Sequence, residues 1–256
     1  MENHEITVAH ALDKYRECSE NYALTSTDFL DISERSAVGI ALGKSGARFT
    51  FFGGYDGAER TVCVFVPDYI ENVCEYFHQN PDDCPIKVLR CKSKPGSPSL
   101  SHRDYLGSLM ALGIERRTLG DIIVYDGGAD IIILNSIEKY LLSEYKSAGR
   151  VNFETEALDI TKLTPPKVNV VQKRISVASA RLDSIVAEAF DLSRDKASGA
   201  IEGGTVFVDS VQVTKPDAKV KEGAAVVLRG AGKIRYVQTV GQTKRDRTAI
   251  IIEKYV

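Results

Sequence analysis

The sequence predicts a mixed α+β protein of three small domains. Its 256 residues exceed the usual size of one domain, and its 43% hydrophobic and 27% charged residues are typical of globular chains. Pro-rich stretches at 94–98 and 164–166 indicate extended segments, because Pro fixes φ and lacks an N–H donor, and domain boundaries are predicted at 164–167 and near 80–85. The predicted domains therefore span residues 1–80, 81–164 and 167–256. This composition excludes collagen-like and wholly disordered chains.

Hydrophobic periodicity predicts the elements of the first domain, an α/β unit. Apolar spacing indicates helices over 8–22 and 29–42, the second preceded by the capping-box spacing of Thr25 and Asp28. Two strands and a helix follow, at 48–52, 61–66 and 68–78, with a Gly-rich turn between the strands.

The middle domain has the predicted order β-α-β-β-α-β. Its strands are 86–91, 121–125, 129–134 and 153–160, and its helices are 102–112 and 137–146. This order is that of a ferredoxin-like fold, which RNA-binding sheets of the RRM type share. The likeness is one of fold order alone, since unrelated proteins share it.

The last domain begins with a predicted strand over 168–177. A helix from Arg181 buries one apolar face, and Ser193 is a favourable N-cap for a second helix over 194–202. A hairpin of 206–208 and 211–213 and later strands, the first at 226–229, complete the domain.

Sequence features that would place the chain in a membrane or around a metal are missing. No apolar run approaches the roughly 18 residues that span a bilayer, and the polar segment MENHEITVAH is not a secretory signal. The five cysteines include no CxxC pair, and the four histidines have no ligand spacing. We therefore expect a cytoplasmic protein with no metal site and no cofactor.

Charge is distributed unevenly along the chain. Residues 1–84 carry 6 Lys and Arg against 15 Asp and Glu, whereas residues 165–256 carry 16 against 10. A basic end on a chain of net charge -2 favours a nucleic-acid contact confined to that end. Chance variation between small domains is an equal explanation on charge alone.

Three sequence motifs resemble enzyme motifs but lack the spacing, the companion motifs or the domain context that those enzymes have. Residues 39–45 have three residues between the glycines, where a phosphate-binding loop needs four, and His102-Arg103-Asp104 lacks the other kinase motifs. Arg181-Leu182-Asp183 echoes a pseudouridine synthase tripeptide but lies in a small basic domain, where Asp183 suits a first helical turn. We therefore predict no catalytic residue and no enzymatic activity.

Cations at the basic end coincide with predicted helix starts. Arg181 begins one helix, and Arg194 and Lys196 begin the next, where free N–H groups and the helix dipole favour anions. Turns that would close around this pair contain Lys215, Arg229 and Lys233. The pattern predicts a phosphate-binding surface, and an ordinary solvated face is the alternative.

Residues 174–235 resemble the S4-type RNA-binding domain, also called the alpha-L motif. The resemblance rests on RLD and SR twelve residues apart, on GGTVFVD and on the RGAGK loop. It implies RNA contacts at Arg181, Ser193, Arg194, Lys196, Lys215 and Arg229, with Arg174 and Lys233 as further candidates. Asp209-Ser210 replaces the Asn-Gly that suits a type I′ turn, which predicts a weaker turn.

The whole chain resembles the bacterial YlmH family through TDFLDISERSAV, FFGGYDGAERTVCVF and SHRDYLGSLMALGIERRTLGDIIV. The resemblance implies a middle RNA-binding domain, a C-terminal S4-type domain and partnership with the ribosome. It also implies links to stalled large subunits and to cell-division gene neighbourhoods. Expected partners are structured RNA (rRNA and tRNA) and the large ribosomal subunit, without DNA or a membrane.

Arginines outside the basic end provide candidates for a second RNA contact. Arg103, Arg116 and Arg117 flank the 102–112 helix. Arg48, Tyr55 and Arg60 flank the Gly-rich hairpin and are further candidates, and ordinary surface charge is the alternative for the five arginines. Two rival functions stay open: an RNA-modifying enzyme that uses Asp104 or Asp121, and a cell-division scaffold whose acidic N-terminal domain binds protein.

Overall fold

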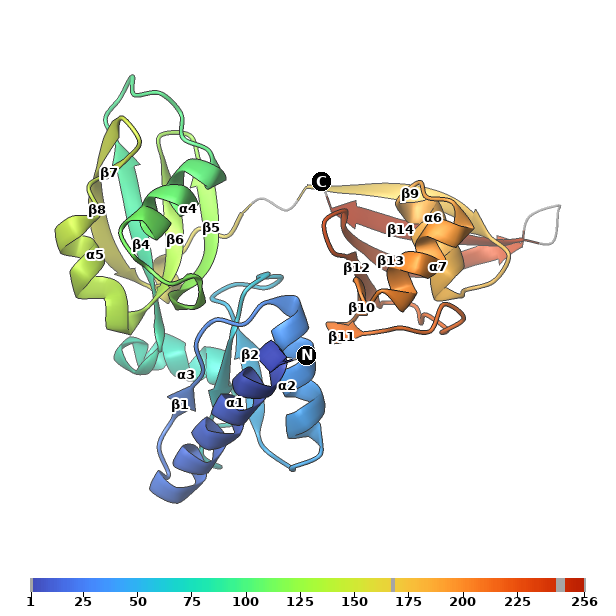
Figure 1. Ribbon diagram of the computed structural model, residues 1–256, viewed down its shortest axis with the longest axis horizontal. Coiled ribbons are helices and arrows are strands. Elements are labelled where there is room, and N and C mark those ends of the chain that lie inside the picture. The colour runs from blue at the N-terminus through green and yellow to red at the C-terminus, as the bar shows by residue number, and fades with distance from the viewer. Residues whose placement is uncertain (1, 167–168, 243–246, 256) are drawn as a thin grey trace. The chain divides into compact units, whose positions relative to one another are not determined.

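The computed structural model describes residues 2–166, 169–242 and 247–255 (Figure 1). The chain forms two compact units, Met1–Pro166 and Lys167–Val256, called here the first and second units. The division lies within the Pro-rich segment 164–167. The predicted start of a strand at Val168 is outside the described residues. Each unit mixes helices and antiparallel sheet, so the predicted α+β class is confirmed.

The first unit begins with two helices on a three-stranded sheet. These elements are α1 (Glu2–Asn21), β1 (Thr25–Ser26), α2 (Ile32–Gly43), β2 (Phe49–Phe52), β3 (Val62–Phe65) and α3 (Val73–Gln79). Asp31 caps α2 in a capping box with Glu34, at 2.9 and 2.8 Å, so the helix begins later than predicted. Thr25, predicted to cap this helix, lies in β1 instead.

The middle of the chain forms a five-stranded antiparallel sheet in the order β5-β6-β4-β8-β7. Its elements are β4 (Ile86–Ser93), α4 (His102–Ala111), β5 (Leu119–Tyr125), β6 (Gly128–Leu134), α5 (Glu138–Glu144), β7 (Ser147–Ala148) and β8 (Val151–Asp159). Short 3-10 helices are η1 (Pro81–Asp83), η2 (Arg116–Thr118), η3 (Asn135–Ile137) and η4 (Ile160–Lys162). Apart from the added β7, the order of elements is the predicted β-α-β-β-α-β.

The two faces of this sheet belong to different cores. Leu89 and Ile131 face α4 and α5, where they cluster with Tyr105. Their neighbours along the two strands, Val88 and Ile132, point to the other face. There they cluster with aromatic and aliphatic residues of the N-terminal elements. The N-terminal elements and the middle sheet thus share one hydrophobic core. The finer division at residues 80–81 stays a prediction.

Asp121 on β5 fastens the Gly-rich hairpin of the N-terminal elements to the middle sheet. Its carboxylate accepts hydrogen bonds from the Tyr55 hydroxyl at 2.8 Å and from the backbone N–H groups of Glu59 and Arg60 at 2.8 and 3.1 Å. The Arg60 guanidinium donates to the carbonyl oxygens of Leu119 and Phe29, both at 3.0 Å. Polar bonds therefore reinforce the shared core at its edge.

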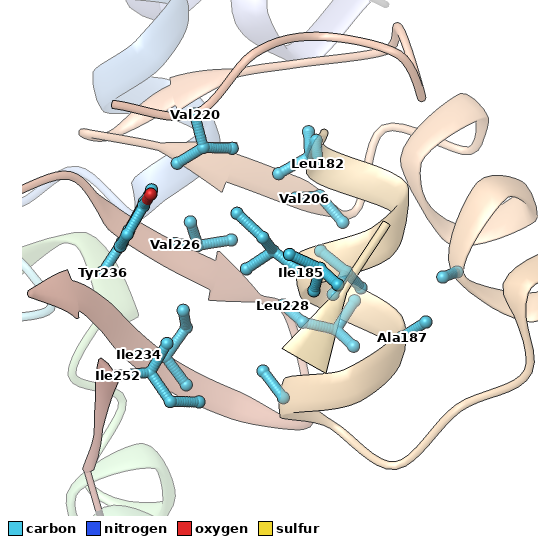
Figure 2. Packing of buried hydrophobic residues seen from close by; sticks show 14 of the residues in the cluster. Leu182, Ile185, Ala187, Val206, Val220, Val226, Leu228, Ile234, Tyr236 and Ile252 are labelled. Atoms are coloured by element: carbon cyan, nitrogen blue, oxygen red, sulfur yellow. The ribbon is translucent and has the colours of Figure 1, made fainter. Parts of the chain in front are cut away.

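The second unit packs two helices on one face of a six-stranded sheet (Figure 1). Its elements are β9 (Val170–Val177), α6 (Leu182–Ala189), α7 (Arg194–Glu202), β10 (Val206–Val208), β11 (Val211–Gln212), β12 (Ala225–Leu228), β13 (Gly232–Gln242) and β14 (Thr248–Tyr255). In the core, Leu182 and Ile185 of α6 face Val206, Val226 and Leu228 of the strands (Figure 2). This apolar face of α6 is the one predicted from its spacing.

The β10–β11 hairpin uses a two-residue turn of the type I′ kind without glycine. Asp209 and Ser210 both have positive φ, 48° and 69°, between the paired residues Val208 and Val211. The Asp209 carboxylate accepts the backbone N–H of Ala225 at 2.9 Å, which helps to hold this conformation. The turn departs from the Asn-Gly pattern in sequence but keeps the turn geometry.

We expect Asp121→Asn to lower the free energy of unfolding of the first unit by about 2 kcal/mol, since a charged acceptor of three hydrogen bonds becomes a neutral one. Urea unfolding followed by circular dichroism measures this change. Asp126→Asn removes an exposed acid from the following turn and is the matched control. Equal stability of the two variants would contradict the role of Asp121.

Candidate nucleic-acid interface

Two arginines of the second unit meet on one carboxylate. Arg181 donates from Nε and Nη2 to both oxygens of Asp183, at 3.1 and 2.9 Å. Arg194 Nη1 lies 3.9 Å from the same carboxylate, and Arg194 Nη2 donates to the Ser184 hydroxyl at 2.7 Å. Because α6 supplies Asp183 and Ser184 while Arg194 begins α7, the network joins the N-terminal ends of both helices.

The carboxylate is buried but the arginines are not. The Asp183 side chain is 6% exposed, whereas those of Arg181 and Arg194 are 44% and 52% exposed. Burial alone would raise the pKa of Asp183, but hydrogen bonds and the charge of Arg181, with the help of Ser184, hold this pKa below its usual range. The guanidinium groups, with five N–H donors each, keep donors accessible to solvent.

The sequence predicted that free backbone N–H groups at the start of α6 would bind an anion, and this prediction is wrong. The backbone N–H groups of Leu182 and Asp183 donate to the carbonyls of Ala218 and Pro216, at 2.8 and 2.9 Å. These donors are therefore already used within the fold. The same bonds bring the turn that carries the exposed Lys215 to the start of α6.

Ser193 and Lys196 lie at the start of α7, as predicted. The Ser193 hydroxyl accepts the backbone N–H of Lys196 at 3.3 Å and so caps the helix. The Lys196 side chain is exposed in the first turn. Arg181, Arg194, Lys196 and Lys215, which lie at the starts of α6 and α7 or in the turn bonded to the start of α6, are called here the basic cluster, with Ser193 as a capping residue.

Three other predicted residues lie away from the basic cluster. Lys233 alternates with the buried Ile234 on β13, so it points away from the helices, and its ammonium stacks on the Tyr255 ring at 4.8 Å. Arg174 alternates with the buried Ile175 on β9 and likewise lies on the outer face. The backbone of Arg229 bonds to Thr205, just after the C-terminal end of α7. The prediction that turns with Lys215, Arg229 and Lys233 close a cleft around the two helix starts is therefore wrong.

The arginines of the first unit that were predicted to contact RNA also differ in their surroundings. Arg116 donates to the carbonyls of Leu119 and Gly120, at 2.7 and 3.1 Å. Burial, with the nearby charge of Arg60, lowers the pKa of Arg116 to about 10. The guanidinium groups of Arg116 and Arg60 therefore bind backbone carbonyls within the first unit, which makes them poor candidates for RNA contacts.

The other arginines of the first unit that were predicted to contact RNA, Arg117, Arg48 and Arg103, are exposed. Arg117 is 62% exposed and forms ion pairs with Glu115 and Asp28, at 2.6 and 3.3 Å. Arg48 donates to the carbonyl of Ile70 at 3.0 Å. Arg103 is exposed in the first turn of α4, so Arg103 is the predicted cation of this unit that best suits a ligand.

A depression of about 220 Å³ beside Arg194 is lined by Glu188, Asp191 and Arg247, among others, and Arg247 pairs with Glu188 at 2.8 Å. Within residues 2–166, 169–242 and 247–255, no three His, Cys, Asp or Glu residues form a group that could hold a metal ion. In the same ranges, no helix has the length and apolar character needed to cross a membrane.

Sequence reasoning treated Asp183 as a helix-dipole residue and missed its role as the anchor of two arginines. The signal was present in the RLD tripeptide, because Arg181 at the N-cap lies within reach of a carboxylate in the first helical turn. The contact with Arg194 depends on how α6 and α7 pack. It could not be read from spacing alone.

We expect Asp183→Asn to destabilise the second unit by about 1–3 kcal/mol at neutral pH. Because the folded pKa of Asp183 is lowered, its contribution is complete above the unfolded value of about 3.9 and is lost as pH falls through the folded value. The stability difference between wild type and variant should therefore shrink below about pH 4. Urea unfolding between pH 2 and 7 measures it, and a difference independent of pH would contradict this assignment.

Comparisons with known proteins agree with the sequence resemblance. Residues 80–162 match the family model described as "Putative RNA-binding domain in YlmH". The chain is 28% identical over 247 residues to the ribosome-associated protein quality control protein P2 of Bacillus subtilis, covering 96% of this chain and 93% of the relative. The solved structure of cell division protein ylmH from Streptococcus pneumoniae, 18% identical with a TM-score of 0.50, covers 62% of this chain and 92% of that one, a likeness of fold. The predicted resemblance of this chain to the YlmH family is thereby confirmed.

Proposed function

We propose that this chain is a cytoplasmic, non-enzymatic protein that binds structured RNA on the large ribosomal subunit, contacting rRNA together with tRNA. We further propose that it acts on stalled subunits. The name of the Bacillus subtilis relative, a ribosome-associated quality control protein, supports the ribosomal partner. The matched RNA-binding domain supports the class of ligand.

The observation that carries the proposal is the pair of arginines on Asp183. Arginine binds phosphate through two parallel N–H donors, and this geometry requires the guanidinium plane to be fixed in advance. The buried Asp183 fixes the Arg181 plane through two hydrogen bonds, and the buried Ser184 holds Arg194 through one. The exposed Lys196 in the first turn of α7 and Lys215 in the turn bonded to the start of α6 add point charges, so the basic cluster can hold neighbouring phosphates of a folded RNA.

The enzyme alternative loses its candidate acids to structural contacts. Asp104 accepts the backbone N–H and the hydroxyl of Ser101, both at 2.7 Å, as a helix cap. Asp121 accepts three hydrogen bonds within the shared core, and Asp183 anchors arginines. A general acid or base needs a carboxyl group that can reach a substrate. These contacts therefore favour a binding protein.

The cell-division scaffold stays a weaker hypothesis. Its support is the printed name of the Streptococcus pneumoniae protein, whose likeness to this chain is one of fold. The basic cluster is suited to a polyanion, whereas a protein scaffold would not require two guanidinium planes held in place.

We expect the double variant Arg181→Glu, Arg194→Glu to lose co-sedimentation with large ribosomal subunits, because both phosphate contacts become repulsive. Sucrose-gradient fractions probed for the protein measure this loss. Arg174→Glu, Arg235→Glu is the matched control, since both residues are exposed on the sheet face opposite α6 and α7 and the net charge changes equally. Binding by the cluster variant, or equal loss in both variants, would refute the assignment.

RNA affinity should fall steeply as salt rises, because phosphate contacts release counterions. Removal of two contacts by Arg181→Gln, Arg194→Gln should reduce the slope of log affinity against log salt by about 2. Filter binding of purified rRNA fragments between 50 and 300 mM KCl measures the slope. An unchanged slope would show that these arginines do not contact phosphate.

A further inference from the structure

The middle sheet cannot bind RNA in the manner of an RRM sheet. RRM domains stack bases on aromatic side chains of the exposed sheet face. Here, on that face of the central strands, Val88 and Ile132 are buried against the N-terminal elements. Further along the same strands, Arg90 and Asp130 fill the paired positions and bind each other through two hydrogen bonds at 2.8 and 2.7 Å. A base therefore needs another place to stack.

Such a place exists where the loop after β4 meets the β5–β6 turn. The backbone N–H of Ser93 donates to the Gly127 carbonyl at 2.9 Å and joins the two segments. Between them lies a pocket of about 250 Å³, lined by residues 93–100, 105 and 125–128. The pocket belongs to the segment that matches the RNA-binding family model. Tyr105 also lines the pocket, although only 1% of this residue is exposed to solvent.

Tyr125 presents a fixed aromatic ring to this pocket. Its hydroxyl donates to Asp130 at 3.2 Å, and Asp130 is itself held by Arg90. The ring lies so close to the backbone that a Cβ on Gly128 would meet Tyr125 Cε2 at 3.0 Å. Even so, 39% of the residue stays exposed. Burial, followed by the charge of Asp130, raises the pKa of Tyr125 to about 12, so the hydroxyl stays protonated.

The polar groups around the pocket suit an uncharged ring that carries both donors and acceptors. Ser97 and Ser99 provide hydroxyl groups that can donate and accept. Lys94 and Asp126 line the pocket with opposite charges, which does not favour a bare phosphate. Arg103, exposed in the first turn of α4 just beyond this loop, can bind the adjoining phosphate.

We propose that this pocket takes one unstacked nucleobase of RNA, with the Tyr125 ring as its stacking surface. The proposal rests on the RNA-binding function proposed above and adds a second, separate contact in the first unit. Aromatic stacking recognises any base, because every base has a π face. The site would therefore read the presence of a bulged or looped-out nucleotide.

The test uses the full chain and an RNA hairpin with one bulged 2-aminopurine, whose fluorescence falls when the base stacks. Wild type should quench this signal. Tyr125→Leu should abolish the quenching and weaken binding of the hairpin about tenfold, as expected for the loss of one stacked base. Tyr125→Phe keeps the ring without the hydroxyl and should quench like wild type, with affinity within about twofold. Circular dichroism checks that each variant is folded.

The controls separate this proposal from the general RNA-binding function. Arg181→Gln, Arg194→Gln should weaken the hairpin complex but keep the quenching at saturating protein. Unchanged quenching in Tyr125→Leu overturns the pocket alone, while absence of hairpin binding by wild type overturns both proposals. Equal loss in Tyr125→Phe and Tyr125→Leu assigns Tyr125 a structural role. The pocket proposal is also overturned if free 2-aminopurine riboside monophosphate binds as tightly as the hairpin. It is overturned as well if a photocrosslinker at position 125 captures protein instead of RNA.

Discussion

The buried carboxylate of Asp183 is the interaction on which the proposed phosphate contact depends. An arginine at a helix start normally samples many rotamers, and ordering it on a ligand costs free energy. Asp183 meets part of this cost during folding, since it holds Arg181 through two hydrogen bonds and attracts Arg194 across the helix pair. The same bond set positions Ser184, so folding of the core and orientation of the basic cluster are coupled.

A partial neutralisation accompanies this orientation. The carboxylate cancels one of the positive charges it holds, which weakens long-range attraction to phosphate. Its oxygens, however, accept two N–H groups of Arg181 and form a longer ion pair with Arg194 at 3.9 Å, and the side chains of both arginines stay about half exposed. A phosphate can therefore approach donors on the outer side while the carboxylate stays within the first turn of α6. Such an arrangement favours correctly spaced phosphates over diffuse attraction to any polyanion.

Sequence patterns predicted most helices and strands, because apolar periodicity and helix capping depend on interactions between residues close together in the chain. The apolar face of α6 and the split order of the middle sheet follow from spacing that local interactions enforce. The start of α2 was placed too early because the Thr25–Asp28 spacing competed with the true capping box at Asp31. What spacing cannot report is which face of a strand meets another element. That is why Lys233 and Arg174 were grouped with Arg181, although they point to the opposite side of the sheet.

The unequal charge of the two ends bears on how such a protein would meet RNA. Residues 1–84 carry 6 cationic against 15 acidic side chains, so this part repels a phosphate backbone, and residues 165–256 carry 16 against 10 and attract it. At physiological salt both effects fade beyond a Debye length of about 8 Å. Attraction therefore acts locally at the basic cluster, and the acidic elements need only lie more than about this distance from the phosphates. A base contact at Tyr125 is compatible with this limit, because stacking requires no net positive charge at the pocket.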